Sequence, residues 1–227
     1  MKKKNYVSTI YDIENKPLTT QYPEELTSYL CKRFDITEKQ KLLEPGLGRG
    51  EFLYQFSKKN IDCYGFDFVE FENYFSDFSF NYKIHDCMKN EELPYEDNFF
   101  DVIYSKSFIE HFYYPEKIFI EFYRILKPGG IIISLTPDWT TIYETFYEDF
   151  THRTPFTIES LKDIHKMSGF KDIHTEKFTQ LPSVWNNKVM EILSNITKYI
   201  APNFLRKKYK WIKFSKEIML LSYAKKD

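Results

Sequence analysis

The sequence lacks an uncharged apolar run of 18 residues, so no helix that crosses a bilayer is expected. Its basic first residues, 1–6, are not followed by the apolar run that a signal peptide needs. Only three cysteines occur, and the wide separation of Cys31, Cys63 and Cys87 favours reduced thiols in a cytoplasm over disulfides or a zinc site. A charge excess is also missing: 32 basic and 33 acidic side chains give a net charge of -1, so nucleic acid is not an expected partner.

An alternation of apolar strands and amphipathic helices is present instead. The 227 residues are enough to bury the core of one full α/β domain. Strands separated by helices favour a mostly parallel sheet covered on both faces. The expected strands are residues 41–44, 63–66, 82–85, 100–104, 131–135, 170–178 and 217–224, and the expected helices are residues 24–34, 51–59, 115–127 and 157–169.

A glycine-rich turn joins the first strand to the next helix. Gly46, Gly48 and Gly50 follow the acidic Glu44, and glycines there let the backbone turn sharply and approach a ligand closely. A dinucleotide site needs G-x-G-x-x-G, but the sixth position is Glu51, whose carboxylate is a poor neighbour for a pyrophosphate. S-adenosylmethionine has no phosphate, so this turn suits it better.

The turn and the landmarks after it resemble those of class I S-adenosylmethionine-dependent methyltransferases of the small-molecule type. Asp67 ends the second strand, 17 residues after Gly50, and Asp86 ends the third. The likeness spans roughly residues 40–136 and recurs in the terminal strands, while Pro45 and Arg49 depart from the usual pattern. The other segments that fall in the family's order are residues 93–105, 109–112 and 125–130.

The resemblance implies a fold. We expect a single Rossmann-like three-layer α/β domain over residues 1–227, with a mostly parallel seven-stranded sheet in the order 3-2-1-4-5-7-6 and an antiparallel last strand. Residues 1–23 are expected to form an N-terminal arm or cap, residues 137–156 an acceptor loop, and residues 181–215 a helical basic insertion before the last strand.

The resemblance also implies the cofactor, S-adenosyl-L-methionine, and the residues that bind it. Asp67 would accept hydrogen bonds from both ribose hydroxyls, and Asp86 would accept from the adenine amino group. The other expected cofactor-binding residues are Glu44, Gly46, Gly48, Gly50, Phe68, Cys87 and Ser105.

Methyl transfer often needs a general base, and the acceptor loop offers one. His152 is the first candidate, with Asp149 to orient its ring; the alternative is that His152 only ties the loop to the sheet or helps to cap the next helix. His111 is the second candidate, with helix-start packing as its alternative. No group of His, Cys and acidic residues has metal-ligand spacing in the sequence, so no metal is predicted.

The acceptor is less constrained. The fourth strand ends in Ser105-Lys106-Ser107, not in the Asn/Asp-Pro-Pro-aromatic signature of many nitrogen methyltransferases, and only Glu110 stands where arginine methyltransferases carry two glutamates. We therefore expect O-methylation of a small molecule, such as a sugar or nucleotide-linked sugar in glycan or metabolite tailoring. The alternatives are RNA, a protein or a quinone-like lipid as the acceptor, or a non-catalytic binding module.

Residues 186–216 are basic, with eight Lys or Arg side chains against the single acid Glu191, and their first half has apolar residues at helical spacing. Three interpretations stay open. The helix packs into the core with a solvated basic flank, or it forms a lid over an anionic acceptor, or it binds a membrane surface or a partner.

Overall fold

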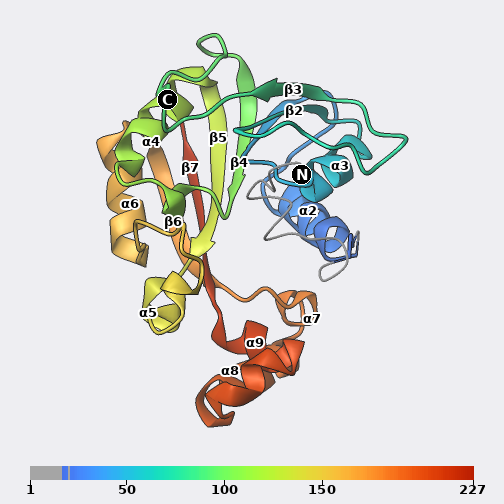
Figure 1. Ribbon diagram of the computed structural model, residues 1–227, viewed down its shortest axis with the longest axis vertical. Helices are drawn as coiled ribbons and strands as arrows, with labels where there is room; N and C mark the ends of the chain where they lie inside the picture. The colour runs from blue at the N-terminus through green and yellow to red at the C-terminus, as the bar shows by residue number, and fades with distance from the viewer. Residues whose placement is uncertain (1–16, 20) are drawn as a thin grey trace, which may run out of the picture. The chain divides into compact units, whose positions relative to one another are not determined.

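A computed structural model describes residues 17–19 and 21–227, and within them a seven-stranded sheet has the order β3-β2-β1-β4-β5-β7-β6 (Figure 1). This order and the antiparallel last strand confirm the predicted fold class. The elements in chain order are α2 (Gln21–Arg33), β1 (Lys41–Pro45), α3 (Glu51–Ser57), β2 (Asp62–Asp67), β3 (Asn81–Ile84), β4 (Phe100–Lys106), η1 (Ile109–His111), α4 (Pro115–Ile125), β5 (Leu126–Pro137), α5 (Trp139–Ile142), η2 (Phe146–Glu148), α6 (Ile158–Met167), β6 (Lys171–Phe178), α7 (Pro182–Trp185), α8 (Lys188–Ile200), η3 (Asn203–Lys207), α9 (Lys210–Lys216) and β7 (Met219–Lys225).

The chain divides into two compact units. The first comprises residues 1–105, 121–131 and 226–227, and the second comprises residues 106–120 and 132–225. The single domain expected from the sequence remains a prediction. The arm or cap expected over residues 1–23 falls mostly outside the described residues, and its last part, residues 21–23, opens α2.

The first unit is built on parallel strands. β1 pairs with β2 and with β4, and β2 pairs with β3, all in parallel. Helix α3 packs against β2, and the approach is close because a Cβ at Gly65 would lie 3.1 Å from Leu53 and 3.2 Å from Leu47. Helix α2 begins at Gln21, three residues before the expected start, since Pro23 is tolerated in a first turn, where its missing N–H would have no helical partner.

Strand β5 begins earlier than the sequence suggests. Pro128-Gly129-Gly130 was expected to end a helix and precede the strand, but α4 ends at Ile125 and β5 already starts at Leu126. The glycines pair with the chain's last residues: Gly129 N–H donates to the carbonyl of Lys226 at 2.8 Å, and Lys226 N–H donates to that of Gly130 at 2.9 Å. This pairing keeps the segment extended.

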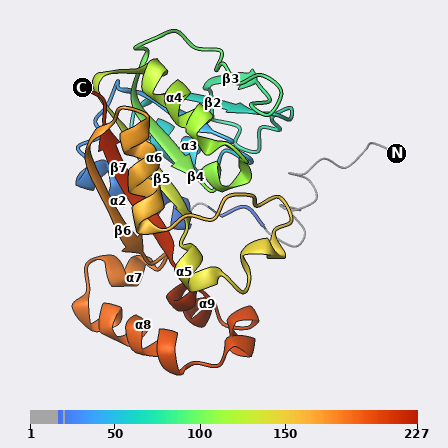
Figure 2. The ribbon, with the colours of Figure 1, turned by 90° about the vertical axis from the view of Figure 1, so that its left-hand side faces the viewer.

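The second unit contains the antiparallel pair β6 and β7, against which α6 packs (Figure 2). Thr157 caps α6 as predicted, since its hydroxyl accepts from the backbone N–H of Ser160 and the Ser160 hydroxyl accepts from the N–H of Thr157. The expected strand over residues 170–178 is confirmed as Lys171–Phe178, within one residue.

Helix α8 corrects one interpretation of the basic insertion. The first of the three interpretations expects the apolar side chains of this helix to pack into the core. These side chains are exposed, and the buried residue of the helix is Ser194, so the core-packing interpretation is wrong. The apolar spacing was a sound indicator of a helix but not of the side that the helix buries. The exposed apolar residues are Val189, Ile192, Leu193, Ile196 and Ile200.

Candidate active site

The glycine turn of the first unit has the conformation that a close ligand requires. Gly46, Gly48 and Gly50 have φ angles of 63°, 57° and 71°, in the left-handed region that favours glycine. The N–H of Gly46 donates to the carbonyl of Phe66 at 2.9 Å, which ties the turn to β2. A Cβ on Gly48 would meet no atom of the described residues within 4 Å, so none of them fills the space over this part of the backbone. That space fits a ligand held against the main chain.

Asp67 is buried at the end of β2 and anchors the same turn. One carboxylate oxygen accepts from Gly48 N–H at 3.0 Å, and the other accepts from Phe68 N–H at 2.8 Å. Burial raises the pKa of Asp67, against the lowering effect of these bonds. The backbone N–H of Val69 also favours the ionised form, so of about four acceptor sites on the carboxylate at least one stays open. A ribose hydroxyl would satisfy it, so the residues of this turn fit S-adenosylmethionine.

Asp86 lies two residues beyond the end of β3, which the structure places at Ile84. Its oxygens accept from the N–H of Met88 at 3.0 Å and pair with the Lys89 ammonium at 2.8 Å. Burial acts to raise the pKa of Asp86, but the bonds from Lys89 and from the Met88 N–H, together with nearby positive charge, outweigh it, so the pKa is lowered. An adenine amino group would therefore meet an ionised carboxylate that already has one cationic partner.

The remaining expected cofactor residues also lie in the first unit. Glu44 and Ser105 are buried near the carboxyl ends of β1 and β4, which are adjacent parallel strands and so end at one edge of the sheet. Phe68 follows β2 directly and is 52% exposed. Burial raises the pKa of the Cys87 thiol to about 12, so this cysteine is not a nucleophile at neutral pH.

Arg49, one of the departures from the family pattern, neutralises Glu51. Its guanidinium donates twice to one Glu51 oxygen, at 3.1 and 2.7 Å, and the N–H of Thr19 donates to the other at 2.9 Å. The carboxylate at the start of α3 is thus compensated by its own neighbours, and the departure has a local structural cause.

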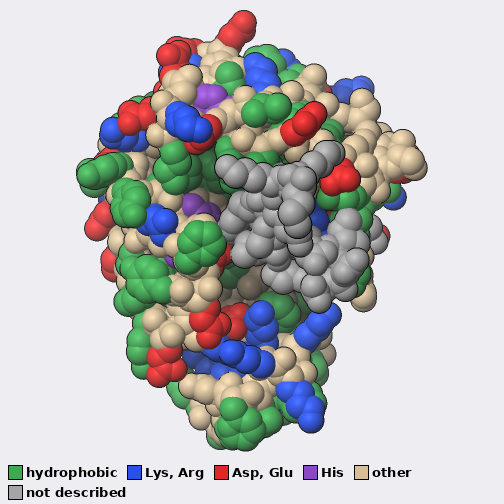
Figure 3. Space-filling model, in the orientation of Figure 1, with side chains coloured by type: hydrophobic (Ala, Val, Ile, Leu, Met, Phe, Trp, Pro, Cys, Tyr) green, Lys and Arg blue, Asp and Glu red, His purple; other side chains and the backbone are tan. Residues whose placement is uncertain are grey.

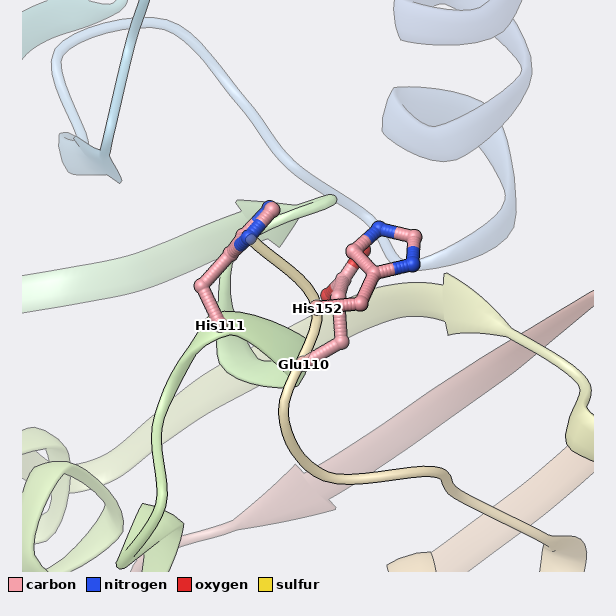
Figure 4. A group of neighbouring side chains, drawn as sticks. All are labelled: Glu110, His111 and His152. Atoms are coloured by element: carbon pink, nitrogen blue, oxygen red, sulfur yellow. The ribbon is translucent and has the colours of Figure 1, made fainter. Parts of the chain in front are cut away.

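The second unit brings Glu110, His111 and His152 together. One potential ligand atom of each lies within 4.8 Å of the others, and the imidazole rings are 5.0 Å apart (Figure 4). Glu110 and His111 belong to η1, and His152 belongs to the acceptor loop. The loop is held to η1 because the N–H groups of Arg153 and Thr154 both donate to the carbonyl of Glu110, at 2.8 and 3.0 Å.

Hydrogen bonds determine which nitrogen carries the proton in the neutral form of each ring. His152 Nδ1 lies 2.6 Å from the carbonyl of Phe146, which can only accept, so Nδ1 carries the proton. His111 Nδ1 lies 3.0 Å from the Thr151 hydroxyl, which donates its own proton to Asp149 at 2.5 Å, so this Nδ1 is also a donor. In the neutral rings, both Nε2 atoms therefore offer a lone pair.

Burial sets the charge of this cluster. It lowers the pKa of His111, although Asp149 acts in the opposite direction, so this ring is neutral at pH 7. Burial also raises the pKa of Glu110, whose Oε2 accepts from the Thr136 hydroxyl at 3.0 Å. Its Oε1 is buried and receives no hydrogen bond from a described residue. Burial thus favours the uncharged form of both His111 and Glu110.

The structure shows contacts of the predicted catalytic residues that the sequence did not indicate. That Asp149 orients His152 stays a prediction; its carboxylate accepts from Thr151, whose hydroxyl contacts His111, and the Phe146 carbonyl accepts from His152. In the sequence, the adjacent Glu110 and His111 indicated a candidate site. A backbone carbonyl leaves no signal in a sequence, and the role of Thr151 depends on the fold of the loop.

Two imidazoles and a carboxylate also form a donor set that suits metal ions, which the sequence spacing did not reveal. We nevertheless expect methyl transfer to survive metal removal, because a sulfonium needs no Lewis acid. Dialysis against EDTA should leave kcat within about twofold, as a rate loss of a metal-dependent step would be far larger. Loss of activity that returns only with added Zn²⁺ or Mn²⁺ would assign the cluster to a metal.

The strand order, the glycine turn and the buried carboxylate at the end of β2 are those expected from the resemblance to class I, S-adenosylmethionine-dependent methyltransferases. Residues 43–134 match the family model described as a methyltransferase domain. Residues 43–134 therefore form an S-adenosylmethionine-dependent methyltransferase domain.

Known proteins similar to the chain include phosphoethanolamine N-methyltransferase 2 of Caenorhabditis elegans, 27% identical over 172 residues, which are 70% of this chain and 38% of that protein. The chain thus spans about two fifths of the length of this relative. A solved Haemonchus contortus phosphoethanolamine N-methyltransferase 2, in complex with phosphomonomethylethanolamine and S-adenosylhomocysteine, has a TM-score of 0.64 at 20% identity, over 88% of this chain and 52% of that one. An S-adenosylmethionine-dependent methyltransferase from Archaeoglobus fulgidus has a TM-score of 0.65 at 21% identity, over 97% and 100%.

Proposed function

We propose that the chain methylates a small phosphorylated acceptor of the phosphoethanolamine type, at an amine whose proton is removed by His152. The observation that carries this proposal is the histidine pair of the second unit, with Nε2 lone pairs fixed by hydrogen bonds at Nδ1. An ammonium group cannot attack until it loses a proton, so it needs a base of this kind. The acceptor class is taken from the printed names of the relatives.

We assign a separate role in methyl transfer to each of His152, Glu110 and His111. Bound S-adenosylmethionine supplies an electrophilic methyl group on a sulfonium with a neutral leaving group. Nε2 of His152 takes the proton of the acceptor, and the resulting imidazolium is stabilised by the nearby Glu110. His111 remains neutral beside it, since burial lowers its pKa, and can accept a hydrogen bond from the acceptor.

A hydroxyl of a sugar or nucleotide-linked sugar is the second candidate acceptor. The same observation favours it, because a hydroxyl benefits from a neutral imidazole within hydrogen-bond reach. The two candidates differ in the group that is methylated and in whether a phosphate alone suffices for recognition.

Product analysis separates them. The purified chain is incubated with S-adenosylmethionine and either phosphoethanolamine, phosphomonomethylethanolamine, ethanolamine or a nucleotide-linked sugar, and the products are identified by mass spectrometry. We expect methylation of the phosphorylated amines and little of ethanolamine. Methylation of the nucleotide-linked sugar alone would favour the second candidate, and cofactor binding without turnover on either class would favour a non-catalytic module.

The basic insertion supports an anionic acceptor through its contacts with the acceptor loop. Arg206 in η3 pairs with Glu148 at 3.2 Å, and Asn203 donates to Glu144 at 3.2 Å. These bonds join the insertion to residues 137–156 within the second unit. Lys207 and Lys208, which follow Arg206, are exposed and add positive charge there.

Neutralising Lys207 and Lys208 together, each to Gln, should raise the KM for a phosphorylated acceptor about fivefold, because two exposed cations near an anion are lost while the Arg206 ion pairs are kept. The KM for S-adenosylmethionine should not change. A variant with Lys162 and Lys166 of α6 changed to Gln is the charge control in the same unit. An unchanged acceptor KM would show that the basic insertion does not bind the acceptor.

A further inference from the structure

Helix α8 packs on its neighbour with its polar side. The hydroxyl of Ser194 donates to that of Ser215 in α9 at 2.9 Å, and both serines are buried. The indole N–H of Trp211, also in α9, donates to the Thr197 hydroxyl at 3.1 Å. The two helices lie side by side in both ribbon views (Figures 1 and 2), so this contact determines which side of α8 faces outward.

The outward side is aliphatic. Val189, Ile192, Leu193, Ile196 and Ile200 recur at spacings of three and four and therefore share one stripe of the helix. Their exposed fractions are 65%, 58%, 46%, 47% and 75%. An amphipathic helix of a globular protein normally turns such a stripe toward the core. In α8 the stripe faces solvent, and an exposed apolar surface of this kind is typical of a binding site for a membrane or another molecule.

Positive charge and aromatic rings surround the stripe. Residues 186–216 hold eight basic side chains and one acid, Glu191, a net charge of +7. Figure 3 shows Lys and Arg side chains gathered around α8 and α9. Tyr199, Phe204 and Tyr209 are exposed, at 80%, 77% and 46%. The exposed lysines are Lys188, Lys207, Lys208, Lys210 and Lys213.

We propose that this α8 surface, formed by the stripe with its basic and aromatic border, docks on a bilayer that contains anionic lipid. Aliphatic side chains enter the boundary of the acyl chains, aromatic rings lie at the headgroups, and lysines contact lipid phosphates. With 13 residues, α8 is roughly 20 Å long. This is shorter than the roughly 30 Å hydrocarbon core of a bilayer, so the proposal places α8 along the surface. Among the described residues no helix is long and apolar enough to cross a membrane.

Charge argues against a second copy of this chain as the occupant. A twofold contact through the stripe would place two segments of net charge +7 against each other. An anionic bilayer instead complements the charge and the apolar stripe together. The proposal does not rest on the proposed acceptor, because it concerns only this surface.

The test is sedimentation of the whole chain with vesicles, without cofactor or acceptor. Vesicles of phosphatidylcholine with 30 mol% phosphatidylglycerol are compared with vesicles of phosphatidylcholine alone, about 0.1 M salt being used in both. We expect the partition coefficient to be about tenfold or more higher for the anionic vesicles, and to fall as salt rises.

Changing Ile192 and Ile196 to Ser should lower that coefficient about 30-fold, because two aliphatic side chains no longer enter the bilayer. The thermal unfolding midpoint should hardly change, since both residues are exposed. A matched control changes Ile120 and Met167, exposed residues elsewhere in the second unit, to Ser and should bind like the wild type.

Absence of vesicle binding by the wild type, or equal loss in the control, would overturn the proposal. So would self-association that the Ile192 and Ile196 changes abolish without any binding to vesicles, since the second copy would then be the occupant. Methyl transfer to a soluble acceptor should be the same in both variants, which keeps this outcome separate from the proposed function.

Discussion

Replacing Asp67 by asparagine should weaken the binding of S-adenosylmethionine by about 100-fold. Both carboxylate oxygens of Asp67 accept backbone N–H groups, from Gly48 and Phe68, so the amide of asparagine would place its own NH₂ against one of these donors. The change would remove at least one of the charge-assisted hydrogen bonds expected to the ribose and would loosen the glycine turn, at a combined cost of about 3 kcal/mol. Isothermal calorimetry measures the affinity directly.

The pH dependence gives a second readout of the same residue. Burial raises the pKa of Asp67, so the carboxylate becomes protonated at a higher pH than an ordinary aspartate. Cofactor affinity should therefore begin to fall, as the pH is lowered, above the usual range of aspartate. The asparagine variant should not show this fall.

Asp62, at the other end of β2, supplies the control. Its carboxylate accepts from the hydroxyl of Tyr64 at 3.1 Å, a bond that asparagine can keep, so the Asp62→Asn variant should bind the cofactor like the wild type. Wild-type affinity in the Asp67 variant would show that this carboxylate does not hold the ribose. If the thermal unfolding midpoints of the Asp67→Asn and Asp62→Asn variants both fell strongly, the loss of affinity would come from a destabilised β2 strand.

The first unit was predictable because local signals determine it. The positive φ angles of Gly46, Gly48 and Gly50 follow from a tight strand-to-helix turn, and Asp67 is fixed by its place at the end of the next strand. Errors occurred where distant segments decide. β5 begins early because Gly129 and Gly130 pair with Lys226, nearly a hundred residues away, and a glycine pair alone gives no indication of such a partner.

The histidine cluster was only partly predictable. His111 and His152 were candidates because of their residue type and their place after strands, but their protonation depends on the Phe146 carbonyl and on Thr151. Neither contact follows from spacing. The outward apolar stripe of α8 is a similar case: periodicity shows that one side is apolar, and only the serine pair with α9 shows that this side faces out.

Changing His152 to asparagine should lower kcat by about 10²–10³-fold and leave the affinity for S-adenosylmethionine unchanged, because the imidazole contributes as a general base and is not expected to bind the cofactor. Asparagine is the informative replacement. Its amide N–H can donate to the Phe146 carbonyl in place of Nδ1, so the tie to the loop is kept while the Nε2 lone pair is lost. Single-turnover kinetics with the preferred acceptor measures the loss.

A comparison with alanine separates a base from a structural tie. If His152 only holds the loop, His152→Asn should have near-wild-type turnover, His152→Ala should be slow, and the assignment as a base fails. If His152 is the base, both variants should be slow to a similar degree, and the loss should shrink at high pH, where more of the acceptor is already deprotonated. His174→Ala, an exposed histidine in β6 of the same unit, should behave like the wild type. His111→Ala should lose less, about tenfold, because a neutral ring that accepts one hydrogen bond contributes less than a proton acceptor.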